Sequence, residues 1–205
     1  EEDFEMVRAR HPVRIRCKTG VRKDGTFIAR EVEILMDGGA FADDSPGVLG
    51  YCVLCSAGPY RIPNIRSSGK VVYTNHLRFA AFRGFGNPQI NFATESQIDE
   101  IAKKLRMDPV ELRLKNAMDV GDTWFGGQII ESNGLKECIS KVCNASNWEE
   151  RSSINQADDG GKCRGLGLAI GGHISGLLGT GAIVRLLEDG TVALNTGATD
   201  IGQGS

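Results

Sequence analysis

Polar and apolar residues alternate along the first part of the chain in the manner of β-strands. Apolar residues occupy every second position from Val13 to Cys17, and Ile28, Val32, Ile34 and Met36 alternate with mostly polar neighbours. Asp24-Gly25 lies between the two runs and is typical of a tight turn. The pattern predicts a two-stranded hairpin that buries one face, with these apolar residues inside.

Helices and further strands are predicted along the rest of the chain. The apolar stretch 46–55 is expected to be helical, residues 68–74 are expected to form a strand, and Pro88 suits the first turn of a helix. Asp108 resembles the N-cap of a helix. After Asn133, apolar residues repeat at helical spacing and predict a further helix. Its buried stripe is expected to include two cysteines and consists of Leu135, Cys138, Ile139, Val142 and Cys143. A second hairpin turns at Asp189-Gly190. The predicted fold class is α+β, with mixed sheets and packed helices.

The segment 147–162 is polar and contains a glycine pair, which is typical of a linker or exposed loop. We therefore expect one subdomain over residues 1–150, and a linker with the start of a second subdomain over residues 151–205.

Composition narrows the classes of function. The 205 residues are 40% hydrophobic, which supplies ample material for a core, and 24 basic against 26 acidic residues leave a net charge of -2. No dense basic run is present, so neither a nucleic acid nor an anionic membrane is indicated as a partner. No apolar run approaches the roughly 20 residues that span a bilayer, and the start is acidic, so a cytoplasmic protein is expected.

The cysteines and histidines do not form a recognisable metal site. Only Cys52 and Cys55 form a Cys-x-x-Cys pair, and that pair lies in an apolar stretch with no second pair to complete a tetrahedral site. Buried thiols are favoured over a metal or redox role. His11, His76 and His173 are scattered singly and lack ligand spacing.

Residues 80–89 carry the strongest candidate chemistry. Gly84 and Gly86 alternate with Phe82, Arg83 and Phe85, so the backbone can approach a ligand while two rings and a guanidinium face it. The alternative is a glycine-rich turn whose phenylalanines join the core. The place of the loop between a strand and a helix start favours an anion or a polar cofactor.

A second glycine-lined ligand loop is predicted at Gly202, Gln203 and Gly204, after an expected strand. A flexible terminus is the other interpretation of that segment.

The chain resembles the molybdenum-cofactor-binding portion of xanthine dehydrogenases, aldehyde oxidases and related molybdenum hydroxylases. The central match is Ala81-Phe-Arg-Gly-Phe-Gly86 with Pro88-Gln89. Further matches follow in order over essentially the whole chain: Glu2-Asp3, Arg10-His11-Pro12, Gly25-Thr26, residues 60–66, Asn75, residues 109–113, Lys115-Asn116, Asp189-Gly190 and Gly202-Gln-Gly204. The resemblance implies the molybdenum-cofactor-binding fold of the xanthine dehydrogenase type, truncated at both ends.

The resemblance also implies roles for particular residues. Phe82, Arg83 and Gly84 are expected to bind the cofactor from one side, and the second loop, Gly202, Gln203 and Gly204, from the other. Phe85 is expected to flank the substrate. Tyr51 stands where xanthine-oxidising relatives carry a substrate-binding arginine, and His173 lies near the place of a second aromatic wall. Glycine at position 84, where the carbon monoxide dehydrogenase branch has cysteine, favours hydroxylation of a carbon centre.

The implied function is the oxidative hydroxylation of an N-heterocycle or an aldehyde, with water as the oxygen source. The cofactor is a molybdenum-pyranopterin, as molybdopterin or its cytosine dinucleotide, and its dithiolene holds the metal without a protein ligand. Iron-sulfur and FAD groups are expected on partner domains or subunits, in an oligomeric parent enzyme.

A glutamate base lies downstream in relatives, and a further cofactor segment lies upstream. The 205 residues alone are therefore expected to be inactive. The alternative is a noncatalytic binding or assembly module that retains the fold without the cofactor.

Overall fold

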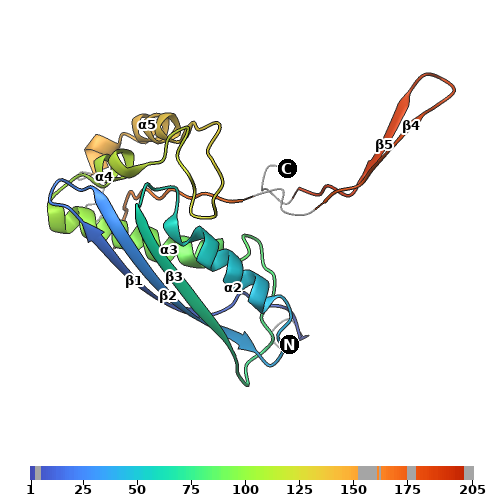
Figure 1. Cartoon of the computed structure of the whole chain (residues 1–205), viewed down its shortest axis with the longest axis horizontal. Coiled ribbons are helices and arrows are strands. Elements are labelled where there is room, and N and C mark those ends of the chain that lie inside the picture. Colours follow the sequence, from blue (N-terminus) through green and yellow to red (C-terminus); the bar gives the residue numbers. More distant parts are fainter. Residues whose placement is uncertain (3–5, 152–160, 162, 175–178, 201–205) are drawn as a thin grey trace. The chain divides into compact units, whose positions relative to one another are not determined.

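The structure is a computed structural model that describes residues 1–2, 6–151, 161, 163–174 and 179–200. The chain divides into two compact units, Glu1–Gly171 and Gly172–Ser205. Figure 1 shows the helices and the larger sheet of the first unit and the hairpin of the second.

The first unit contains a three-stranded mixed sheet in the order β1-β2-β3. Strand β1 (Val13–Val21) pairs antiparallel with β2 (Phe27–Gly39), and β2 pairs parallel with β3 (Asn64–Tyr73). The predicted hairpin and the α+β class are thus confirmed. Strand β3 begins four residues before the strand predicted from residue 68 and ends at Tyr73.

One expectation for the hairpin is wrong. Ile28 is 37% exposed, whereas Phe27 is buried. The pairing of β1 with β2 shifts between Gly20 and Val21, so that Val21 pairs with Phe27 instead of Ile28. Such a bulge exchanges the inner and outer sides of the strand, and strict alternation therefore fails at this end.

Two helices, α2 (Ser45–Leu54) and α3 (Asn87–Leu105), pack on this sheet. Helix α4 (Pro109–Asn116) packs against α3, and α5 (Leu135–Ala145) packs against α4. Two short 3-10 turns are η1 (Cys55–Ala57) and η2 (Trp148–Glu150). Helix α2 packs against β2 and β3, and α3 packs against β1 (Figure 1). Pro88 lies in the first turn of α3, and the Asp108 carboxylate accepts the first free amides of α4. The predicted starts of both helices are confirmed.

The apolar stripe predicted after Asn133 is buried only in part. Helix α5 forms where expected, and Ile139 is buried, but Cys138 is exposed and Val142 is 53% exposed. Cys143 is half-buried. The spacing predicted the helix correctly and was wrong in placing Cys138 in the core, because the apolar stripe is wider than the surface that covers it.

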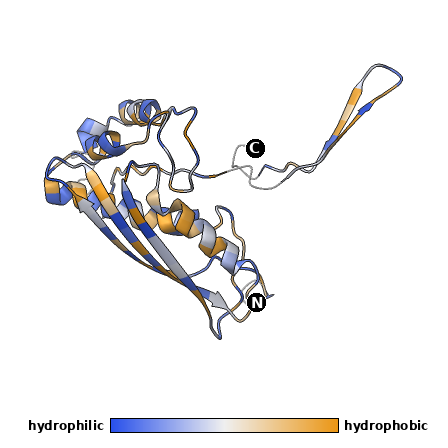
Figure 2. Ribbon diagram, in the orientation of Figure 1, coloured by the Kyte–Doolittle hydropathy of each residue, from blue (hydrophilic) through white to orange (hydrophobic). Residues whose placement is uncertain are grey.

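The second unit contains the predicted hairpin of β4 (Ala182–Leu186) and β5 (Val192–Thr196), which pair antiparallel. One face of it carries four apolar residues that are 61–77% exposed, Val184, Leu186, Val192 and Leu194. Figure 2 shows this hydrophobic hairpin, and it also shows hydrophilic and hydrophobic residues alternating along β1 to β3.

No helix among the described residues is both long and apolar enough to cross a bilayer. The boundary predicted near residues 150–160 falls mostly on residues outside the described part of the chain, and the division into residues 1–150 and 151–205 stays a prediction.

Candidate functional site

The loop between β3 and α3 has an unusual backbone. Gly84, Phe85 and Gly86 all have left-handed φ angles, at 95°, 47° and 97°. The Phe85 amide donates to the Phe82 carbonyl at 2.8 Å, and the Asn87 amide donates to the Gly84 carbonyl at 2.9 Å. Glycine adopts such angles freely, whereas Phe85 does so at a cost in free energy. Two overlapping tight turns therefore hold the loop in a strained shape.

The loop lies directly on helix α2. A Cβ atom at Gly86 would stand 2.5 Å from the Val48 carbonyl oxygen, and the Cys52 thiol donates to the Gly86 carbonyl at 3.3 Å. At Gly84, a Cβ atom would meet the Pro88 ring at 2.6 Å. Both glycines are therefore required by close approach as well as by φ.

Two side chains of the loop face solvent. Phe82 is 50% exposed, and Arg83 is exposed without a hydrogen-bond or ion-pair partner for its guanidinium among the residues that the structure describes. Phe85 is half-buried beside the core cluster of α2. The loop therefore combines a structural half with an exposed half, and the exposed ring and guanidinium favour a ligand site over a purely structural turn.

The structure brings together two of the predicted substrate residues. The rings of Tyr51 and Phe85 meet edge to face, with centroids 6.0 Å apart and planes at 85°. Gly47, one turn before Tyr51 on α2, leaves room for this arrangement, because a Cβ atom there would lie 3.3 Å from Phe85 Cζ. The pair forms a small aromatic wall next to the loop.

The other predicted residues cannot be joined to this wall. His173 is exposed and belongs to the second unit. Gly202, Gln203 and Gly204 lie outside the described residues. Their roles stay predictions.

The thiols next to the loop are unsuited to nucleophilic chemistry. Burial raises the pKa of Cys52 to about 12 and that of Cys55 to about 12, and neighbouring Cys55 adds to the shift at Cys52. Both thiols are therefore protonated at neutral pH and belong to the core, as predicted. Within the described ranges, no group of His, Cys, Asp and Glu is arranged to hold a metal ion.

Several residues of the matched motifs build the fold instead of the site. The Glu95 carboxylate accepts the Tyr60 hydroxyl at 2.6 Å, the Arg113 Nε at 2.9 Å and the Ile170 amide at 2.9 Å. Burial alone would lower the pKa of Arg113, but Glu95 reverses this and the net pKa is raised. Burial, followed by Glu95, raises the pKa of Tyr60. These groups form a satisfied buried network in the core.

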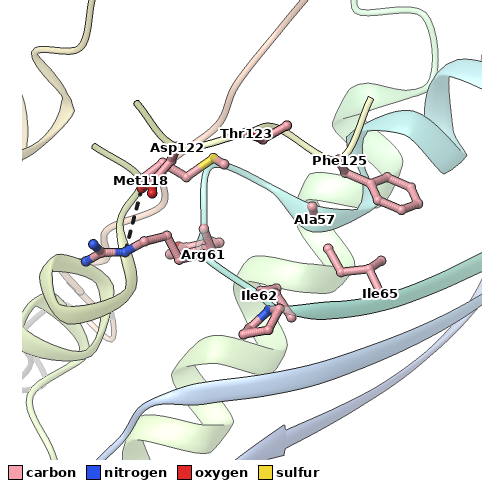
Figure 3. A pocket seen from close by; sticks show the side chains of 10 residues that line it. Ala57, Arg61, Ile62, Ile65, Met118, Asp122, Thr123 and Phe125 are labelled. Atoms are coloured by element: carbon pink, nitrogen blue, oxygen red, sulfur yellow. Dashed lines mark ion pairs between the residues drawn. The ribbon is translucent and has the colours of Figure 1, made fainter. Parts of the chain in front are cut away.

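A separate cavity of about 490 Å³ opens beside Tyr60 (Figure 3). Apolar side chains line it, and its guanidinium, Arg61, is already paired with Asp119 at 3.7 Å and with Asp122 at 3.8 Å. The cavity thus presents no unpaired charge, in contrast to the loop at Arg83.

Arg10 is a loop contact to which sequence reasoning gave no role. It donates to the Arg83 carbonyl at 2.8 Å, although the two residues are 73 positions apart. The only signal for it was its place in the matched Arg10-His11-Pro12 motif.

The residues present fit an anionic organic cofactor held without protein metal ligands. Three successive residues of the loop, Gly84 to Gly86, have left-handed backbone angles, and the neighbouring exposed Arg83 guanidinium has no partner among the described residues. Guanidinium groups and glycine-lined loops are the donors that phosphate-bearing cofactors use.

Comparisons with known proteins agree with this chemistry. Family profiles described as molybdopterin cofactor-binding domains match residues 1–117 and 141–205. The nicotinate dehydrogenase large molybdopterin subunit of Eubacterium barkeri is 42% identical over 143 residues, which make up 69% of this chain and 34% of that protein. The xanthine dehydrogenase molybdenum-binding subunit of Escherichia coli O157:H7 is 36% identical over 216 residues, covering 100% of this chain and 28% of that subunit.

The fold agrees as well. The structure of the aldehyde oxidoreductase from Desulfovibrio gigas matches with a TM-score of 0.81 and 33% identity, over 94% of this chain and 22% of that one. The chain thus spans 34% or less of these relatives. Because the first profile alone covers more than half of the chain, and the fold and the loop agree with it, the chain belongs to the molybdopterin cofactor-binding family of the xanthine dehydrogenases and aldehyde oxidoreductases.

Proposed function

We propose that this chain forms one wall of the molybdenum-pyranopterin site in an enzyme that oxidatively hydroxylates an N-heterocycle or an aldehyde. The observation that carries the proposal is the left-handed loop at Gly84, Phe85 and Gly86, which leaves the neighbouring Arg83 guanidinium without a partner among the described residues. When bound, the cofactor supplies the two-electron oxidation of the substrate carbon, with water as the source of oxygen.

The residues of the loop act by binding and orienting. Arg83 is assigned to an anionic part of the cofactor, because a planar guanidinium can donate two parallel hydrogen bonds to such a group. Phe82 covers the loop with an apolar ring that limits access of water. Gly84 allows the backbone to approach the cofactor, and Gly202, Gln203 and Gly204 are proposed to complete the site from the second loop.

The aromatic wall is assigned to the substrate. Phe85 and Tyr51 lie edge to face against each other, and the ring surface that this contact leaves free is proposed to pack against a planar heterocycle or an aromatic aldehyde. Tyr51 replaces the positive charge of xanthine-oxidising relatives by a phenol, so a substrate that depends on a cation for recognition is disfavoured. His173 is proposed as a further substrate contact from the second unit.

Turnover requires more than these residues. Iron-sulfur and flavin groups on partner domains or subunits are proposed to remove the electrons, and the base that activates water is proposed to lie outside this chain. The 205 residues alone are therefore expected to be inactive. Measurable turnover by the isolated chain with added cofactor would refute this part of the proposal.

Metal analysis of the natural full-length protein, expressed in a host that makes the cofactor, tests the function directly. We expect about one molybdenum atom per chain, together with the fluorescent oxidation product of the pterin. A protein without molybdenum, after normal maturation of a known molybdenum enzyme in the same cells, would refute the proposal and favour a noncatalytic assembly module.

A matched pair of variants tests the site. Arg83→Ala is expected to reduce the retained molybdenum, because it removes the loop's guanidinium, which has no partner in the described part of the chain. Arg14→Ala, which removes an exposed arginine of β1 at the groove that Leu35 and Lys70 also line, is the control. Equal retention in the two variants would show that Arg83 does not bind the cofactor.

A further inference from the structure

The N-terminal residues 9–11 run beside the cofactor loop as a strap. The backbone of Ala9 forms a parallel bridge with Phe79, and the Ala80 amide donates to the Ala9 carbonyl at 3.2 Å. These contacts bring the next residue, Arg10, to the point where the loop begins.

Arg10 contacts the loop on both sides of its left-handed segment. Its Nη2 donates to the Arg83 carbonyl at 2.8 Å, and its Nη1 donates to Gln89 Oε1 at 3.3 Å. The guanidinium also lies over the Phe82 ring, with Cζ 4.6 Å from the ring centroid. One side chain therefore joins the residues before Gly84 to the first turn of α3 after Gly86.

The strap is itself anchored in the core. His11 is buried, and its Nε2 lies 2.9 Å from the Ser45 hydroxyl at the start of α2. The Gln89 amide group returns a hydrogen bond to the His11 carbonyl at 3.4 Å. Arg10 is thus held between a fixed backbone and the loop, which reduces the conformational entropy that its contacts cost.

We propose that Arg10 is a positioning residue of the cofactor site, which acts through the loop and does not have to touch the cofactor. The loop holds three successive residues in the left-handed region, including Phe85, and such a segment relaxes unless its surroundings hold it. Arg10 holds its two ends at a fixed separation. The proposal rests on the proposed function, because the segment that Arg10 positions is the loop assigned to the cofactor.

The geometry requires a guanidinium. Two nitrogen atoms of one planar group reach two acceptors on different segments while its face covers a ring, and an ammonium group cannot reproduce this. Arg10→Lys is therefore expected to restore only part of what Arg10→Ala removes.

The test uses the natural full-length holoenzyme with three variants, Arg10→Ala, Arg10→Lys and the control Arg14→Ala. Hydrogen exchange of the amides over residues 82–90 reports the loop, exchange over β2 reports global stability, and the rate of molybdenum loss on dialysis reports retention. For Arg10→Ala we expect exchange of the loop amides and molybdenum loss to accelerate by about 10- to 100-fold, since charge-assisted hydrogen bonds and a cation–π contact are lost. Arg10→Lys should fall between Arg10→Ala and the wild type, and Arg14→Ala should match the wild type.

Two results would overturn the proposal. One is loop exchange in Arg10→Ala that equals that of Arg14→Ala, and the other is an equal acceleration over β2, which would make Arg10 a general stabiliser. If the wild type contains no molybdenum, the proposed function fails, whereas the exchange over residues 82–90 still decides whether Arg10 holds the loop.

Discussion

Gly86→Ala should disturb the contact between the cofactor loop and helix α2. The new methyl group would stand 2.5 Å from the Val48 carbonyl oxygen and 3.3 Å from the Cys52 amide nitrogen, so the loop has to move away from the helix. That movement also breaks the hydrogen bond from the Cys52 thiol to the Gly86 carbonyl. The substitution therefore combines a backbone clash with the loss of a contact.

The magnitude follows from two terms. Placing an alanine at a φ of 97° costs about 1–2 kcal/mol relative to glycine. Relief of an overlap with backbone atoms adds about 1–3 kcal/mol, as overpacking does elsewhere. A loss of about 3 kcal/mol in the free energy of unfolding is expected, which lowers the Tm by roughly 6–12 °C for a unit of this size.

The control is the same substitution within helix α2, the helix against which Gly86 packs. Gly50 lies within α2, is exposed, and has no atom within 4 Å of its added Cβ position. Gly50→Ala should stabilise the helix by about 0.5–1 kcal/mol. Thermal unfolding of the two full-length variants measures opposite shifts in Tm. If Gly86→Ala were as stable as Gly50→Ala, the close approach of loop and helix would be wrong.

Two further predictions concern buried polar groups. Glu95→Ala should lower the free energy of unfolding by about 3–5 kcal/mol, because among the described residues buried Arg113 keeps only the exposed carboxylate of Asp99 as an ionic partner. Denaturant unfolding measures this loss, and a cost below about 1 kcal/mol would contradict the prediction. Burial lowers the pKa of His11 below its usual 6.5, although Asp37 and the two acidic residues before α2 act in the opposite direction. The folded state therefore binds fewer protons than the unfolded state near this pH. As a result, the free energy of unfolding is expected to fall as the pH drops through and below about 6.5. His11→Gln should flatten this dependence in denaturant titrations between pH 5 and 8, and an unchanged slope would show that other groups cause it.

Local chemistry explains which parts of the fold could be predicted. The turn at Asp24-Gly25, the proline start of α3 and the Asp108 cap each depend on residues a few positions apart. Ile28 and Cys138 were misplaced because their exposure depends on what lies across the sheet or beside the helix. A one-residue register shift and the extent of a covering surface leave no trace in the spacing of apolar residues.

In the candidate site too, features set by neighbouring residues could be predicted, and features set by distant residues could not. The glycines and rings of the loop indicated a ligand site from the sequence, since their chemistry is local. The left-handed φ of Phe85 could not be predicted, because a non-glycine residue adopts it only when its surroundings impose it. Arg10 was missed because it acts on residues 73 to 79 positions away.

The matched motifs have different physical roles, and this affects how far a resemblance can be used. Asn116 accepts the Phe27 amide and donates to the Gly25 carbonyl, so two of the matched motifs meet in one structural contact at the hairpin turn. Such residues stabilise the fold whether or not a cofactor is bound.

The loop has no comparable structural need for the exposed Arg83 side chain, since its guanidinium has no partner among the described residues. A module that had lost the cofactor could keep Asn116 and its partners and vary Arg83 at no cost in stability. The presence of both sets in one chain therefore favours a protein that still binds the cofactor.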